Sequence, residues 1–170
     1  MTELLLVRHG ETDWNREGRW QGHADPPLND AGRAQARALG KTLANERVDA
    51  IYTSDLRRAA ETAEILGAAL GRPVTSDPDL REIDVGSWSG LTRDEVAERY
   101  PDWDAHDGES RDALQARVVG AVRRIARRHP GGRVLIVTHG GSIRSLERHV
   151  NGESERVTGN CEVRRLPFTD

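Results

Sequence analysis

Short runs of apolar residues recur along the chain and stop at polar or glycine residues, as buried strands do. The clearest run covers residues 133–138, whose sequence RVLIVT is β-branched and apolar throughout its interior. A strand covered on both faces has this composition, because neither face meets water. Strands are expected at residues 4–7, 48–53 and 133–138, with a weaker one near a sheet edge at residues 162–166.

Between these strands, apolar positions recur at helical spacing. Asn29 is suited to cap the first of these helices at its N-terminus. The helical patterns are carried by residues 31–39, 56–70, 114–125 and 143–150. Strands that alternate with amphipathic helices predict an α/β fold, a three-layer α/β/α sandwich with a mostly parallel central sheet. No repeat, low-complexity segment or linker divides the chain, so residues 1–170 are expected to form a single domain.

The composition fits a soluble globular protein, because 36% of the residues are hydrophobic and 31% are charged. The formal net charge of -3 gives no electrostatic reason to expect nucleic acid or an anionic membrane as a partner. The N-terminus lacks the features of a signal peptide, and no apolar run approaches the roughly 20 residues that span a bilayer. The single cysteine, Cys161, excludes an intramolecular disulfide. We therefore expect a cytoplasmic protein.

Reactive side chains stand where three of the expected strands end. The first strand is followed by Arg8 and His9, the second leads to Arg58, and the third is followed by His139 and Gly140. Ligands of a parallel α/β sheet bind beyond the carboxyl ends of its strands, so these groups are expected in one crevice. Arginine donors match phosphate geometry, glycines before a helix expose backbone N–H groups to an anion, and neutral histidine can attack phosphorus. The crevice is therefore predicted to bind a phosphoryl group.

A series of sequence blocks resembles, in order, the motifs of the histidine phosphatase superfamily, also called the phosphoglycerate mutase-like family. The blocks are residues 6–15 (LVRHGETDWN), 27–36 (PLNDAGRAQA), 54–63 (SDLRRAAETA), 80–90 (LREIDVGSWSG), and 108–110 (GES) with 137–141 (VTHGG). The triplet R-H-G alone is weak evidence, but this ordered series over nearly the whole chain is strong. The resemblance implies the phosphoglycerate mutase-like fold and the branch of small phosphatases.

The resemblance also assigns roles to individual residues. His9 would be the nucleophile that carries the phosphoryl group, and Glu82 would protonate the leaving alkoxide and later activate water. The residues that would bind the phosphoryl oxygens or line the substrate mouth are Arg8, Arg58, His139, Asn15, Thr12, Gln21, Gly22 and Gly140. The implied activity is that of a phosphomonoesterase that forms a phosphohistidine and needs neither a metal ion nor a cofactor. Its expected substrate is a small phosphorylated metabolite: α-ribazole phosphate, a sugar phosphate, a phosphoglycerate derivative, or several of these.

Other functions stay open at this point. A cofactor-dependent phosphoglycerate mutase would use the same histidine, but family mutases carry a longer insertion with paired arginines. Here residues 91–109 are short and hold Arg93 and Arg99 as separate arginines, which disfavours a mutase. A non-catalytic phosphate-binding module would lack the catalytic residues that this chain keeps. A metalloenzyme is disfavoured because the sequence has no ligand spacing such as H-E-x-x-H.

Several further features permit two interpretations. Residues 86–109 are the least regular stretch and are expected to form a lid or a wall of the pocket. The residues that either contact substrate or serve only packing or solvation are Trp88, Trp103, His23 and His106. Ser89 stands where many family phosphatases have a second glutamate, which leaves the substrate preference open. The oligomeric state is open as well, and a homodimer is one candidate arrangement.

Overall fold

A five-stranded sheet forms the centre of the computed structural model, which describes residues 1–102, 107–154 and 156–169. Its strand order is β3-β2-β4-β1-β5, with bounds β1 (Thr2–Arg8), β2 (Ala50–Thr53), β3 (Val74–Ser76), β4 (Arg133–Thr138) and β5 (Val163–Phe168). The first four strands run parallel, and β5 pairs with β1 in the antiparallel direction at the sheet edge. The predicted mostly parallel sheet, with its weaker edge strand, is confirmed.

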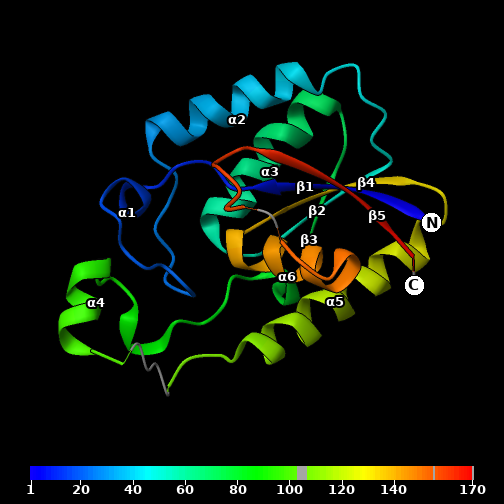
Figure 1. Ribbon diagram of the computed structural model, residues 1–170. Helices are drawn as coiled ribbons and strands as arrows, with labels where there is room; N and C mark the ends of the chain where they lie inside the picture. The colour runs from blue at the N-terminus through cyan, green and yellow to red at the C-terminus, as the bar shows by residue number, and fades with distance from the viewer. Residues whose placement is uncertain (103–106, 155, 170) are drawn as a thin grey trace.

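Helices cover both faces of this sheet. Figure 1 shows α2 (Asp30–Thr42) and α3 (Arg57–Leu70) on one side, and α5 (Arg111–Arg128) and α6 (Gly140–Asn151) on the other. Side chains of β1 alternate between the two layers: Leu5 and Val7 pack with α2 and α3, whereas Leu4 and Leu6 pack with α5 and α6. Each of these side chains is fully buried, and such burial contributes roughly 1.5–3 kcal/mol per side chain. The three-layer α/β/α sandwich is therefore confirmed.

Most expected elements are present, with shifted ends. The chain enters β2 at Ala50 and not at residue 48, and α6 begins at Gly140, three residues earlier than its apolar stripe indicates. Asn29 caps α2 as expected, because its side-chain oxygen accepts a hydrogen bond from the backbone of Gly32 at 2.8 Å. The elements that periodicity missed are all short: β3, α1 (Asp13–Arg16), α4 (Arg93–Arg99) and the 3₁₀ turns η1 (Pro78–Leu80) and η2 (Gly86–Trp88).

The neighbouring strands β1 and β4 lead to helices on opposite faces of the sheet. These strands are parallel neighbours in the sheet, with Arg8 opposite Thr138. The segment that leaves β1 leads to α2 on one face, whereas the segment that leaves β4 enters α6 on the other face (Figure 1). Adjacent strands whose connections diverge in this way leave a crevice at their carboxyl ends. His9 and His139 each follow one of these two strands, so both histidines stand at that crevice.

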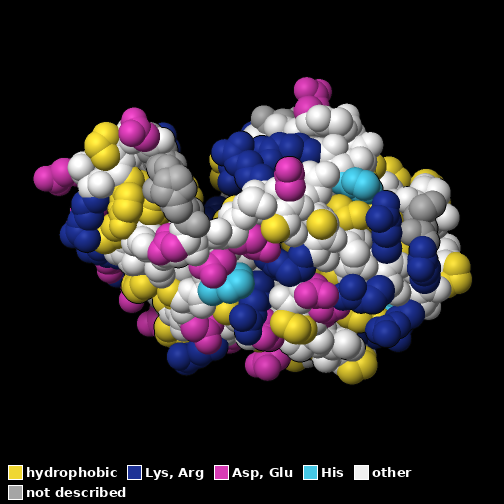
Figure 2. Space-filling model, turned by 90° about the horizontal axis from the view of Figure 1, so that it is seen from below, with side chains coloured by type: hydrophobic (Ala, Val, Ile, Leu, Met, Phe, Trp, Pro, Cys, Tyr) yellow, Lys and Arg dark blue, Asp and Glu magenta, His cyan; other side chains and the backbone are white. Residues whose placement is uncertain are grey.

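The segment that carries η2 and α4 projects beyond the strand ends, away from the sheet (Figure 1). Figure 2 shows a hollow between this projection and the body of the molecule, with Lys and Arg side chains on the wall that faces it. Residues 86–99, which carry η2 and α4, therefore form one side of an open depression. None of the helices formed by the described residues is long and apolar enough to cross a lipid bilayer.

Candidate active site

His9 presents one free ring nitrogen to the crevice. Its Nδ1 lies 2.7 Å from the carbonyl oxygen of Gly10, so Nδ1 carries the proton and donates it, which leaves the Nε2 lone pair available. The side chain is 2% exposed. Burial, followed by the positive charges of Arg58 and Arg8, holds the pKa of His9 well below its usual range. His9 is therefore a neutral imidazole at pH 7, which is the state that a nucleophile requires.

The loop that carries His9 is held from two sides. The backbone N–H of Gly10 donates to the hydroxyl of Thr62 at 3.0 Å, and that hydroxyl donates to the carbonyl of Arg58 at 2.7 Å. From the other side, the amide of Asn160 donates to the carbonyl of His9 at 2.9 Å. The ring is thus fixed by its backbone as well as by its own hydrogen bond.

Two buried arginines flank His9 with part of their donor capacity unused. Arg8 donates to the carbonyl of Thr158 at 2.8 Å, and Arg58 donates to the carbonyls of Ala24 at 2.7 Å and Gly22 at 2.8 Å. The Nε atoms of both arginines are buried and have no hydrogen-bond partner among the described residues. Burial lowers the pKa of Arg58 to about 10, against the opposing effect of Glu82. Buried cations of this kind favour an anionic ligand.

His139 lies beside His9, with 5.2 Å between the ring centroids. Its Nε2 is 2.9 Å from the hydroxyl of Ser54, which also accepts the backbone N–H of Leu56 at 3.2 Å. Since His139 Nε2 is the acceptor available to the Ser54 proton among the described residues, the ring keeps its own proton on Nδ1. Nδ1 is buried without a partner there. Burial and the charge of Arg58 hold the pKa of His139 well below its usual range, so the ring is a neutral donor.

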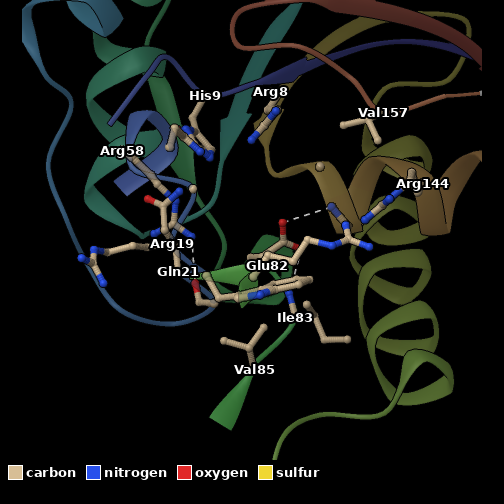
Figure 3. Close-up of a pocket in the computed structure, with 17 residues that line it drawn as sticks. Arg8, His9, Arg19, Gln21, Arg58, Glu82, Ile83, Val85, Arg144 and Val157 are labelled. Atoms are coloured by element: carbon tan, nitrogen blue, oxygen red, sulfur yellow. Dashed lines mark hydrogen bonds between the residues drawn. The ribbon is translucent and has the colours of Figure 1, made fainter. Parts of the chain in front are cut away.

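Glu82 faces these groups from the loop after η1. Its carboxylate accepts the backbone N–H groups of Ile83 at 2.9 Å and of Gly141 at 3.0 Å, the latter at the start of α6. A Cβ at position 141 would overlap this carboxylate, so the close approach requires glycine. Arg117 holds the Glu82 segment by donating to its backbone carbonyl at 3.3 Å, while it pairs with Glu109 at 2.7 Å. In Figure 3, Arg8, His9 and Arg58 point into one space, with Glu82 across from them.

These side chains surround a cavity of about 550 Å³. The residues expected from sequence that line it are Arg8, His9, Asn15, Gln21, Gly22, Arg58, Glu82 and Gly140. Thr12 and His139 are completely buried and are not among the residues that line it. Thr12 acts on the lining indirectly, since its hydroxyl donates to Gln21 at 2.8 Å and accepts the backbone N–H of Asn15 at 3.1 Å.

The cavity also has lining residues that sequence analysis missed. They are Gly18, Arg19, Trp20, Ile83, Val85, Arg93, Arg144 and Val157, whereas Gly141 also lines the cavity and belongs to the glycine pair expected before the helix. Most of them belong to loops whose path no periodicity indicates. Arg144 is an exception, because its position follows directly once α6 is known to start at Gly140. Ser54 contacts His139, and Arg117 contacts the backbone of Glu82. The sequence did not indicate these two contacts, because each joins residues that are distant in sequence.

The ambiguous residues can now be placed. His23 does not line the cavity; its Nε2 lies 2.9 Å from the carbonyl of Glu82, to which it donates. Trp88 packs against Trp20, with 5.3 Å between ring centroids, and so supports the cavity wall. Trp103 and His106 lie outside the described residues. No group of three or more His, Cys, Asp or Glu side chains that could hold a metal ion occurs in the described part of the chain.

Comparison with known proteins places this site in context. The model of the histidine phosphatase superfamily (branch 1) matches residues 4–170. A metal-independent phosphoserine phosphatase from Arabidopsis thaliana is 42% identical over 160 residues, covering 86% of this chain and 67% of that protein. A probable phosphoglycerate mutase GpmB from Salmonella arizonae is 33% identical over 186 residues, covering 100% of this chain and 86% of that protein. The solved structure of a mycobacterial glucosyl-3-phosphoglycerate phosphatase with VO3 has a TM-score of 0.91 at 33% identity, over 97% of this chain and 90% of that one.

Proposed function

The chain belongs to the histidine phosphatase superfamily, and from this membership we propose that it hydrolyses small phosphate monoesters through a phosphohistidine at His9. Its similarity to named phosphatases identifies it as a phosphoric monoester hydrolase. The observation that carries the proposed mechanism is the set of unused donors around His9: Arg8 Nε, Arg58 Nε and His139 Nδ1 are all buried and unpaired among the described residues. A phosphoryl group beside His9 Nε2 would satisfy all three.

In the first step, Nε2 of His9 attacks phosphorus and the ester P–O bond breaks. The donors of Arg8, Arg58 and His139 stabilise the charge that spreads over the phosphoryl oxygens. Glu82, on the far side of the cavity, gives its proton to the departing oxygen, so the alcohol leaves neutral. His9 is left with the phosphoryl group on Nε2, while its proton stays on Nδ1 and is donated in a hydrogen bond to the Gly10 carbonyl.

In the second step, a water molecule enters where the alcohol has left. Glu82, now a carboxylate, takes a proton from this water while the oxygen attacks phosphorus. The P–N bond breaks, inorganic phosphate forms, and neutral His9 and protonated Glu82 are restored. Dividing the reaction into two displacements replaces direct attack by water with attack by a better nucleophile.

We further propose that these steps need no metal ion. The name of the Arabidopsis relative supports this, as does a donor set that neutralises the phosphoryl oxygens with protein groups alone. A cytoplasmic location stays a prediction. The mutase relative keeps open a second activity, in which the phosphoryl group on His9 would pass to a sugar acid in place of water.

The test is turnover of p-nitrophenyl phosphate and 3-phosphoglycerate with excess chelator, for the wild type and for His9→Ala. The proposal predicts phosphate release that survives chelation and is lost in the variant. Loss of turnover on chelation, or turnover that persists without His9, would contradict it. Conversion of 3-phosphoglycerate to 2-phosphoglycerate without release of phosphate would show a mutase.

A further inference from the structure

Arg144 is a half-buried arginine in the lining of the cavity that the proposed phosphoryl transfer does not use. Among the described residues it has no hydrogen bond and no ion pair. Other arginines of the lining are engaged: Arg8 and Arg58 bind backbone carbonyls, and Arg19 pairs with Glu17 at 2.7 Å. A positive charge without a protein partner, directed into a ligand cavity, favours a negative group on the ligand.

Arg144 reaches the cavity from α6. It stands on α6, one helical turn after Gly140, and Figure 3 shows its side chain extending from that helix on the Glu82 side of the cavity. Its charge is near enough to contribute to a lowered pKa of Arg8, after the larger effect of burial. Since Glu82 is the proposed donor to the leaving oxygen, Arg144 lies on the side from which the leaving alcohol departs.

Apolar side chains share this outer lining with two further arginines, Arg19 and Arg93. The apolar members are Trp20, Ile83, Val85 and Val157, and Val157 has 61% of its surface exposed. A single guanidinium matches a monoanion with two oxygens, which it binds through two parallel hydrogen bonds.

We propose that Arg144 is a specificity-determining residue that binds a carboxylate on the alcohol part of the substrate. The substrate class is then phosphate monoesters of small hydroxy acids or hydroxy amino acids, with the carboxylate a few bonds from the ester oxygen. This inference rests on the proposed phosphatase function, and it adds the group that distinguishes preferred esters from others.

The experiment compares substrates that differ only in the carboxylate. O-phosphoserine and O-phosphoethanolamine share the phosphate and the ammonium group, and 3-phosphoglycerate and glycerol 3-phosphate form a second pair without nitrogen. For each, kcat/KM is measured for the wild type, for Arg144→Met and for Arg148→Met. Arg148 is a matched control, because it lies on the same helix, is exposed and does not line the cavity.

The wild type should prefer the carboxylate member of each pair, and Arg144→Met should reduce that preference by roughly tenfold to a hundredfold. Arg148→Met should leave it unchanged. Equal losses on both members of a pair, no loss on either, or a wild type without preference would overturn the proposal. Turnover of p-nitrophenyl phosphate by the wild type separates the two ideas: its absence contradicts the phosphatase function itself, whereas its presence with no carboxylate preference contradicts only the role of Arg144.

Discussion

Ser54→Ala tests how His139 is prepared to act as a donor. The Ser54 hydroxyl is completely buried and lies between Nε2 of His139, at 2.9 Å, and the backbone N–H of Leu56, at 3.2 Å. Alanine removes the partner of both groups and leaves two buried polar atoms unsatisfied. It also removes the hydrogen bond that keeps the His139 proton on Nδ1, so the other tautomer, which turns a lone pair toward the phosphoryl oxygens, becomes accessible.

The magnitudes follow from these contacts. One orphaned buried polar group costs about 1–3 kcal/mol, so two such groups should lower the free energy of unfolding by about 2–6 kcal/mol. A hydrogen bond to a charged group contributes about 1.5–3 kcal/mol, so its loss in the transition state should lower kcat/KM by roughly tenfold to a hundredfold. Urea unfolding measures the first quantity, and hydrolysis of p-nitrophenyl phosphate under conditions where the variant is folded measures the second.

Thr2→Val serves as the control for loss of a buried hydroxyl. Thr2 is 3% exposed and donates to the carbonyl of His129 at 3.0 Å, at the amino end of β1 and away from the cavity. The Thr2→Val substitution should lower the free energy of unfolding by about 1 kcal/mol and leave kcat/KM unchanged. If Ser54→Ala lowers stability but keeps kcat/KM within about twofold of the wild type, our account of the His139 tautomer is wrong.

Three further predictions concern the protonation of Glu82, His9 and His139. Glu82→Gln should lower kcat/KM on 3-phosphoglycerate by about 10²–10⁴-fold but lower kcat/KM on p-nitrophenyl phosphate much less, because p-nitrophenolate leaves without a proton and kcat/KM reports only the steps through its departure; equal losses in kcat/KM would refute the acid role. The pH dependence of kcat/KM should show an acid limb below about pH 6.5, because the lowered pKa of His9 keeps its ring neutral to lower pH. An acid limb at or above about pH 6.5 would contradict a neutral His9 with a lowered pKa. The free energy of unfolding should likewise fall as the pH drops below about 6.5, since His9 and His139 bind protons more readily in the unfolded chain, and urea titrations at pH 5 and 7 would show it.

The sequence was sufficient to predict four of the five strands, all but β3, and the position of the crevice. The apolar runs of β1 and β4 end at the residues that begin the site, and parallel strands bring such ends together whatever the intervening loops do. The family motifs then supplied roles for His9 and Glu82. The short helices α1 and α4 escaped prediction because each is set by a capping box at Thr12 or Thr92 and is too short to show periodicity.

Other parts of the site depend on tertiary packing. Arg117 reaches the carbonyl of Glu82 from α5, 35 residues further along the chain, and its own sequence context is that of a solvated helical arginine. The sequence around Arg144 is likewise typical of a surface residue, and its place in the cavity lining becomes clear only once the start of α6 is known. Such contacts follow from how helices pack on the sheet, which neither composition nor spacing encodes locally.

The central claim is that His9 carries the phosphoryl group, and trapping that intermediate tests it most directly. The purified protein would be mixed with a ³²P-labelled substrate, quenched in alkali within milliseconds and digested for mass spectrometry, with His9→Ala processed in parallel. Our account predicts a base-stable, acid-labile phosphoryl group on the peptide that contains His9, formed at the rate of turnover and missing from the variant. Full turnover by the wild type with no label on His9, or with label on another residue, would contradict it.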